Sequence, residues 1–168
     1  TWGLAGSTDA KSLDAQAGSE SAFSTLAQGL AGLNLVHDVG YMDNGMVCST
    51  AQLILGDENI GMTKRFIRGI EVNSETLARE LIEQVGPGGH FLDCDHTYEH
   101  FKNELWRPNL MTRTAYEEWQ EQGSKDAATR IQEKLRDIVE NHAALPLPDK
   151  TLAGLKAIRR KGESELLK

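Results

Sequence analysis

The chain has 168 residues, with 18 Lys and Arg against 25 Asp and Glu and a formal net charge of −7. This length fits one domain or part of one, and the acidic balance argues against nucleic acid as a partner, because phosphate-binding proteins carry an excess of Lys and Arg. No apolar run reaches the roughly 18 residues of a membrane span. Cys48 and Cys94 are too few for a disulfide framework, so we expect a soluble cytoplasmic protein.

Short apolar runs and helical patterns alternate along the chain. In chain order, the apolar runs predict strands over residues 2–5, 33–38 and 89–93. Apolar residues at helical spacing predict helices over residues 13–31, 49–68, 74–85, 96–106, 116–122, 125–142 and 152–167. The N-caps expected for four of them are Ser49 or Thr50, Ser74, Asp95 and Ser124.

The order of the elements predicts an α/β fold. Strands that alternate with helices favour parallel β/α units, because a parallel connection needs a crossover. Three isolated strands would leave the edges of the sheet bare, so either the rest of the sheet lies in sequence outside the chain or the fold is a small open sheet with many helices. The first is favoured, because the chain begins at Thr1 without Met and resembles a piece of a longer protein.

Polar side chains follow the second predicted strand directly. His37 and Asp38 come first, and Tyr41 and Asp43 lie in the loop after them. In parallel β/α folds the reacting groups gather at the carboxyl ends of the strands. A His beside an Asp can act as a general base whose tautomer the carboxylate fixes, and a phenol can donate to a developing anion. The other interpretation is that the acidic residues only form a turn and that His37 is a hydrogen-bonded core residue.

A second segment with chemical potential lies between residues 90 and 100. His96 and His100 share one face of the predicted helix, as in zinc peptidases, but Thr97 stands where those enzymes have Glu. We therefore favour hydrogen-bonded histidines at a helix start near a substrate pocket over a zinc hydrolase that uses Cys94, His96 and His100.

Several motifs together are similar to one known family. Residues 86–92 read GPGGHFL, residues 96–101 read HTYEHF and residues 106–108 read WRP. Residues 14–18 (DAQAG), 34–37 (NLVH), 68–72 (RGIEV) and 116–119 (YEEW) extend the pattern. With these motifs in order, the chain resembles the C-terminal portion of the trimethylamine methyltransferase family over most of its length.

The resemblance implies a fold and a division of the chain. Members of that family are longer proteins that form a (β/α)8 TIM barrel. Residues 1–112 would then be the last β/α units of the barrel, and residues 113–168 would be C-terminal helices that pack on it.

The resemblance also implies a reaction. The family moves a methyl group from trimethylamine to the cobalt of a corrinoid (cobalamin) carried by a separate corrinoid protein, the entry step of methylotrophic methanogenesis. Trimethylamine-using members contain pyrrolysine, and relatives without it act on quaternary amines such as glycine betaine. No pyrrolysine occurs in the 168 residues, so a quaternary amine stays open as the substrate, as does a non-catalytic module that docks a corrinoid protein. Taken alone, this piece is expected to be inactive.

The expected site combines the two polar segments. Its histidines lie in motifs of the resemblance, and the roles follow from side-chain chemistry, because carboxylates and aromatic rings attract a methylated ammonium. We expect no metal and no directly bound cofactor, a corrinoid protein and a small methylated amine as partners, no nucleic acid or membrane partner, and a homo-oligomer. The residues expected to be catalytic are His37, Asp38, Tyr41 and His96, and those expected to bind substrate are Asp43, His90, Glu99 and His100.

Overall fold

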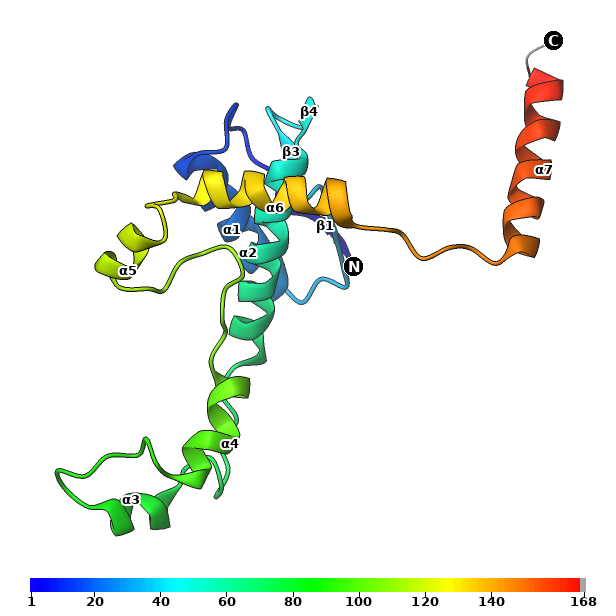
Figure 1. Cartoon of the computed structure of the whole chain (residues 1–168). Helices are drawn as coiled ribbons and strands as arrows, with labels where there is room; N and C mark the ends of the chain where they lie inside the picture. The colour runs from blue at the N-terminus through cyan, green and yellow to red at the C-terminus, as the bar shows by residue number, and fades with distance from the viewer. Residues whose placement is uncertain (167–168) are drawn as a thin grey trace. The chain divides into compact units, whose positions relative to one another are not determined.

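The computed structural model describes residues 1–166, so Leu167, the predicted end of the last helix, lies outside the described residues. Within them the chain is a mixed α/β protein, mostly helical with two small sheets (Figure 1). It divides into two compact units, Thr1–Arg136 and Asp137–Lys168, which are described separately.

The first elements form a parallel β/α unit. β1 (Trp2–Leu4), α1 (Ala15–Leu30) and β2 (Leu35–His37) confirm the first two predicted strands and the helix between them. In the parallel register Leu4 pairs with His37, so both strands end at the same edge of the sheet. Asp14 caps α1 by accepting the N–H groups of Gln16 and Ala17. A hydrogen bond from Ser12 and those amides hold the pKa of Asp14 below its usual value.

A short hairpin follows β2, where the sequence predicted only a loop. β3 (Tyr41–Met42) and β4 (Val47–Cys48) pair antiparallel. Asp43, Asn44 and Gly45 in the turn have φ values of 51°, 55° and 80°. Asp and Asn tolerate this left-handed conformation better than most residues, and Gly has no side chain to oppose it. Strands of two residues are too short for their apolar alternation to be recognised.

The third predicted strand does not form. Over residues 89–93 the chain turns instead, and the N–H of Cys94 donates to the carbonyl of Phe91. Gly86 and Gly88, just before it, have φ values of 66° and 81°. Within residues 1–166 no neighbouring strand lies beside this segment, and an unpaired strand is not stable. The prediction of a strand at 89–93 is therefore wrong.

The longest helix of the first unit is α2 (Thr50–Arg68), which confirms the predicted helix over 49–68. Ser49 caps it by accepting the N–H of Gln52, and it ends at Gly69. It packs beside α1, where Nδ2 of Asn59 donates to Oγ of Ser21 at 3.1 Å (Figure 1). The buried side chains of α1 at this contact are small, which allows the two helices to approach closely. They are Ala17, Ser21 and Thr25.

Three shorter helices follow α2. They are α3 (Arg79–Val85), α4 (Asp95–Glu104) and α5 (Tyr116–Glu121), and they confirm predicted helices with shifted ends. The start of α3 lies later than predicted because Asn73 closes a turn first: its Oδ1 accepts the N–H of Thr76 at 2.9 Å. Ser74 is therefore not the N-cap.

The remaining predicted caps also need correction. Cys94 precedes α4, and Asp95 is the first residue of the helix rather than its cap. α6 (Ala127–Asn141) starts after Asp126, whose carboxylate accepts the N–H of Thr129 at 2.7 Å, so the prediction that Ser124 caps this helix is wrong. Hydrogen bonds from the hydroxyl and then from the N–H of Thr129 hold the pKa of Asp126 below its usual value.

The largest core cluster lies on α2. Ile131 of α6 is 1% exposed and forms one buried cluster with Ala51 and Leu55 of α2 and with Leu110 from the segment before α5. In the second unit, α7 (Asp149–Leu166) confirms the last predicted helix as far as the structure describes it. No helix within residues 1–166 is long and apolar enough to cross a membrane.

Candidate functional site

The first candidate pair lies where β2 ends. Nδ1 of His37 is 2.6 Å from Oδ1 of Asp38, and both side chains are partly exposed. Asp38 has a φ of 78°, which turns the chain sharply and brings its carboxylate back to the imidazole of the preceding residue. A carboxylate that accepts the Nδ1–H leaves Nε2 unprotonated and able to accept a proton.

An aromatic ring completes this corner. The rings of Trp2 and His37 meet edge to face, with centroids 5.0 Å apart. The register explains the contact, because Trp2 and Leu4 of β1 pair with Leu35 and His37 of β2 on one face of the sheet. Trp2 is not among the site residues predicted from the sequence. The signal was present in the parallel pairing of the two strands, which puts their alternate residues on the same face.

Hydrogen bonds join the loops that leave β1 and β2. The N–H of Ala5 donates to the carbonyl of His37, and the N–H of Thr8 donates to the carbonyl of Tyr41, both at 3.0 Å. Nζ of Lys11 lies 3.0 Å from Oδ1 of Asp43. The structure therefore brings together four of the predicted site residues, and we call them the strand-end cluster: His37, Asp38, Tyr41 and Asp43.

A carboxylate on α1 holds the first of these loops. Glu20 accepts the hydroxyl of Thr8 at 2.6 Å and the N–H of Asp9 at 2.9 Å. The hydrogen bond from Thr8 is the main reason that the pKa of Glu20 lies below its usual value. The sequence predicts no role for Glu20, because no local pattern indicates that a residue of α1 reaches the loop before it.

The other predicted site residues lie on and before α4. Nε2 of His96 is 3.0 Å from the carbonyl oxygen of Glu75, and Nε2 of His100 is 3.3 Å from the carboxylate of the same residue. The two imidazole rings lie 4.3 Å apart between centroids. Glu99 points to solvent. Both histidines therefore bind the turn that precedes α3.

His90 lies in a separate contact with Asp93, at 3.4 Å between Nδ1 and Oδ1, and both side chains are largely exposed. An open hollow of about 680 Å³ lies between α3 and the start of α4, and His90, Asp93, Cys94 and His96 line it. Among residues 1–166 no three His, Cys, Asp or Glu side chains are placed to hold a metal ion. We call His90, His96, Glu99 and His100 the α4 cluster.

The two clusters lie at opposite ends of α2. Near its start, the N–H of Ser49 donates to the carbonyl of Gly40, next to the strand-end cluster. Near its end, Arg65 and Arg68 each reach the carboxylate of Glu104 on α4 at 3.0 Å. A helix of 19 residues is about 28 Å long. In this chain His96 therefore does not join His37, Asp38 and Tyr41 in one site.

What the strand-end cluster can do follows from its groups. It offers a proton acceptor oriented by a carboxylate, a phenol and an exposed indole, with acidic groups beside them. Aromatic faces and carboxylates suit a soft cation such as a methylated ammonium, because both attract positive charge with little demand for hydrogen-bond donors.

Comparison with known proteins agrees with the resemblance noted in the sequence. The profile of the trimethylamine methyltransferase (MTTB) family matches residues 2–165. The chain is 36% identical over 165 residues to the trimethylamine methyltransferase MttB of Desulfitobacterium hafniense (strain DSM 10664 / DCB-2), a match that covers 98% of the chain and 33% of the relative. It is 37% identical over 156 residues to MttB1 of Methanosarcina mazei, covering 93% of the chain and 31% of the relative.

A relative named for a different substrate is nearly as similar. The glycine betaine methyltransferase of Desulfitobacterium hafniense (strain Y51) is 35% identical over 153 residues, covering 90% of the chain and 32% of the relative. The chain spans about a third of the length of each of these relatives. Because the family profile matches almost every residue, the chain belongs to the trimethylamine methyltransferase family.

Proposed function

We propose that the chain is the C-terminal part of an enzyme that transfers a methyl group from trimethylamine to the cobalt of a corrinoid carried by a separate protein. The observation that carries the proposal is the family match over residues 2–165. Under this proposal the unit of β1, α1 and β2 is one of the repeats of a (β/α)8 barrel, which takes about 250 residues to close. The parallel pair with its helical crossover supports this.

The strand-end cluster would bind the amine. Asp38 and the indole of Trp2 would attract the methylated ammonium, and Tyr41 would orient it. In the transfer, the N–CH₃ bond breaks with its electron pair left on nitrogen, and the methyl group passes to the reduced cobalt of the partner. The tasks of this chain are to position the amine and to exclude water, because the cobalt supplies the nucleophile. In a trimethylamine enzyme, a pyrrolysine upstream of or near Thr1 would hold the amine.

The test is methyl transfer by the complete gene product, with a reduced corrinoid protein as acceptor and trimethylamine as donor. Replacing His37 with Ala or Asp38 with Asn is expected to lower kcat/KM by about a hundredfold, in the range of a lost positioning or acid–base group. The matched control is His142→Ala, because His142 is an exposed histidine outside both clusters. Unchanged turnover in both strand-end variants would contradict the proposed site. Partner binding without turnover in the wild type would favour a docking module.

One observation favours glycine betaine as a second candidate substrate. Besides a quaternary ammonium, betaine carries a carboxylate, and Nζ of Lys11 lies beside Asp43 at the strand-end cluster, where it could bind that carboxylate. If betaine is the substrate, Lys11→Met will raise its KM by about tenfold, as loss of a charge-assisted bond predicts. If trimethylamine is the substrate, Lys11→Met will change its KM little, because trimethylamine has no carboxylate for Lys11 to bind.

A further inference from the structure

Three arginines line one open hollow in this acidic protein. The hollow lies between the end of α4 and the start of α6, has a volume of about 660 Å³, and includes Arg107, Arg113 and Arg130 in its lining. The residues that line it, all within the described part of the chain, include no Asp or Glu. The charge of this hollow is therefore positive, although the chain as a whole has a net charge of −7. We call it the arginine hollow.

The backbone of the arginine hollow is fixed before any ligand binds. Glu58 of α2 is 4% exposed and accepts three successive N–H groups, those of Asn109, Leu110 and Met111, at 3.2, 2.9 and 3.1 Å. From the other side, Nε of Arg130 donates to the carbonyl of Leu110 at 2.6 Å. Because both contacts tie the loop to helices, little conformational entropy is lost when a ligand enters.

The arginines keep donors available. Each guanidinium has five N–H donors. Arg130 uses Nε and one Nη for the carbonyls of Leu110 and Lys125, and Arg113 uses one Nη for the carbonyl of Thr112. Arg107 lies with its guanidinium carbon 5.6 Å from the ring centre of Phe101, a contact that leaves its N–H edges open. The remaining donors can form the paired bonds that phosphate and carboxylate groups accept.

Neighbouring carboxylates are occupied elsewhere. Glu104 binds Arg65 and Arg68, Glu118 accepts the side-chain amide of Gln122, and Glu133 pairs with Lys125. Glu58, beneath the loop, is satisfied by its three backbone amides. The carboxylate of Asp126 interacts electrostatically with Arg130. Within residues 1–166, no ion pair joins Arg107 or Arg113 to any of these neighbouring carboxylates.

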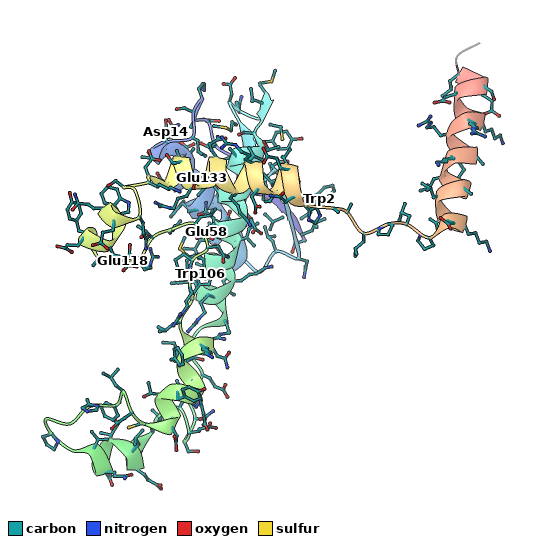
Figure 2. All side chains as sticks on the ribbon, in the orientation of Figure 1. Trp2, Asp14, Glu58, Trp106, Glu118 and Glu133 are labelled. Carbon is teal, nitrogen blue, oxygen red and sulfur yellow. The ribbon has the colours of Figure 1, made fainter. Side chains whose placement is uncertain are left out.

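The lining also has an apolar part. Trp106 lies against α2, where a Cβ added to Gly61 would come within 3.3 Å of its Nε1 (Figure 2). Leu105, Pro108 and Met111 add further apolar surface. A volume of about 660 Å³ falls within the usual size of small-molecule sites.

We propose that the arginine hollow binds an organic anion, a phosphate or carboxylate group attached to an apolar or ring-shaped body. The three arginines take the charged group, and Trp106 with its apolar neighbours takes the body. This inference does not depend on the proposed methyl transfer, because it uses no residue of the strand-end cluster.

The test is calorimetric titration of the complete gene product with phenyl phosphate, benzoate and inorganic phosphate. Phenyl phosphate is expected to bind at one site, more tightly than inorganic phosphate and less tightly as ionic strength rises. Replacing both Arg107 and Arg113 with Gln should weaken binding by about tenfold or more, because hydrogen bonds to charged groups are lost. Arg136→Gln, on an exposed position of α6, is the matched control and should bind as the wild type does.

The outcomes separate the possible sources. Stronger binding of phenyl phosphate than of benzoate assigns the hollow to a phosphate-bearing ligand, and the reverse order assigns it to a carboxylate. Absence of saturable binding, or equal weakening in Arg136→Gln and in the double variant, would overturn the proposal. If the double variant loses its helical circular dichroism, Arg113→Gln alone is compared with Arg136→Gln, since Arg113 is exposed and donates to the carbonyl of Thr112 in its own loop.

Discussion

Glu58 illustrates how much one buried carboxylate can organise. It is a charged residue in the middle of α2, yet it is 4% exposed and is satisfied by three backbone amides of a loop about fifty positions later in the sequence. Burial of a carboxylate is tolerated only with such partners, because an unpaired buried charge is very costly. This residue therefore couples α2 to the segment that leads into α5 and α6.

Replacing Glu58 with Gln should lower the free energy of unfolding by about 1.5–3 kcal/mol, because an amide nitrogen will face at least one of the three N–H donors. Urea unfolding followed by circular dichroism measures the change. Glu133→Gln is the control: its exposed pair with Lys125 should contribute less than about 1 kcal/mol. Equal losses in the two variants would show that the amides of the loop do not depend on Glu58.

Glu20 predicts a pH dependence. Its pKa is lowered below the ordinary value of 4.5, mainly by the hydroxyl of Thr8. Because the pKa of Glu20 is lower in the folded than in the unfolded chain, its ionised carboxylate stabilises the fold at pH values above the unfolded-state pKa. This contribution is lost as the pH falls through the folded-state pKa, which lies below 4.5. An NMR titration should find the Glu20 carboxyl below 4.5 in the wild type and closer to it in Thr8→Val. A Glu20 pKa at or above that value in the wild type would refute the contact.

At the scale of elements, the strand-end cluster depends on the close approach of α2 to the loop after β2. A Cβ on Gly56 would overlap the side chain of Val39, which follows Asp38 in the chain. A glycine in the middle of a helix lowers helix stability by about 1 kcal/mol relative to Ala. The close contact between Gly56 and Val39 therefore explains the glycine better than helix propensity does.

Gly56→Ala should therefore destabilise the fold by about 1–3 kcal/mol, since the overlap outweighs the gain in helix propensity. Gly18→Ala in α1 is the matched control, because nothing lies within 4 Å of its added Cβ, and it should stabilise by up to about 1 kcal/mol. Thermal unfolding of both variants checks the pair. Stabilisation of both would mean that Val39 moves away freely.

The elements also show where sequence reasoning succeeds and where it stops. Helix positions and the first β/α unit were predictable, because apolar spacing and caps such as Ser49 are local signals. The strand at 89–93 was not, because a strand exists only when a neighbour pairs with it. In the site, the pair of His37 and Asp38 was predictable because the two residues are neighbours in the sequence. The contact of Trp2 with His37 was not, because it depends on the register of β1 and β2, and the separation of His96 from His37 was not, because it depends on the length of α2.

At the scale of the whole molecule, the exposed face of the first sheet has a clear consequence. The apolar residues Trp2, Leu4 and Leu35 lie on one face of the paired strands β1 and β2, and they are 71%, 58% and 57% exposed. Within residues 1–166 each of these strands pairs with one neighbour only, so its other edge is open. Open edges and apolar faces promote association between chains.

The 168-residue chain alone is expected to self-associate, and sedimentation velocity over a concentration series measures this. Leu35→Asp should reduce association, because it places a charge in the exposed face without touching the packed side of β2. A monomer at every concentration would contradict the expectation that this face needs a partner.

The most direct test of the account is a methyl-transfer assay with the complete gene product, purified from its source cells together with their corrinoid proteins. We predict that trimethylamine, or glycine betaine if Lys11 binds a carboxylate, is demethylated as methylated corrinoid forms in equal amount, and that His37→Ala removes the activity while His142→Ala does not. A complete, folded protein that methylates no corrinoid from either amine would contradict the central claim.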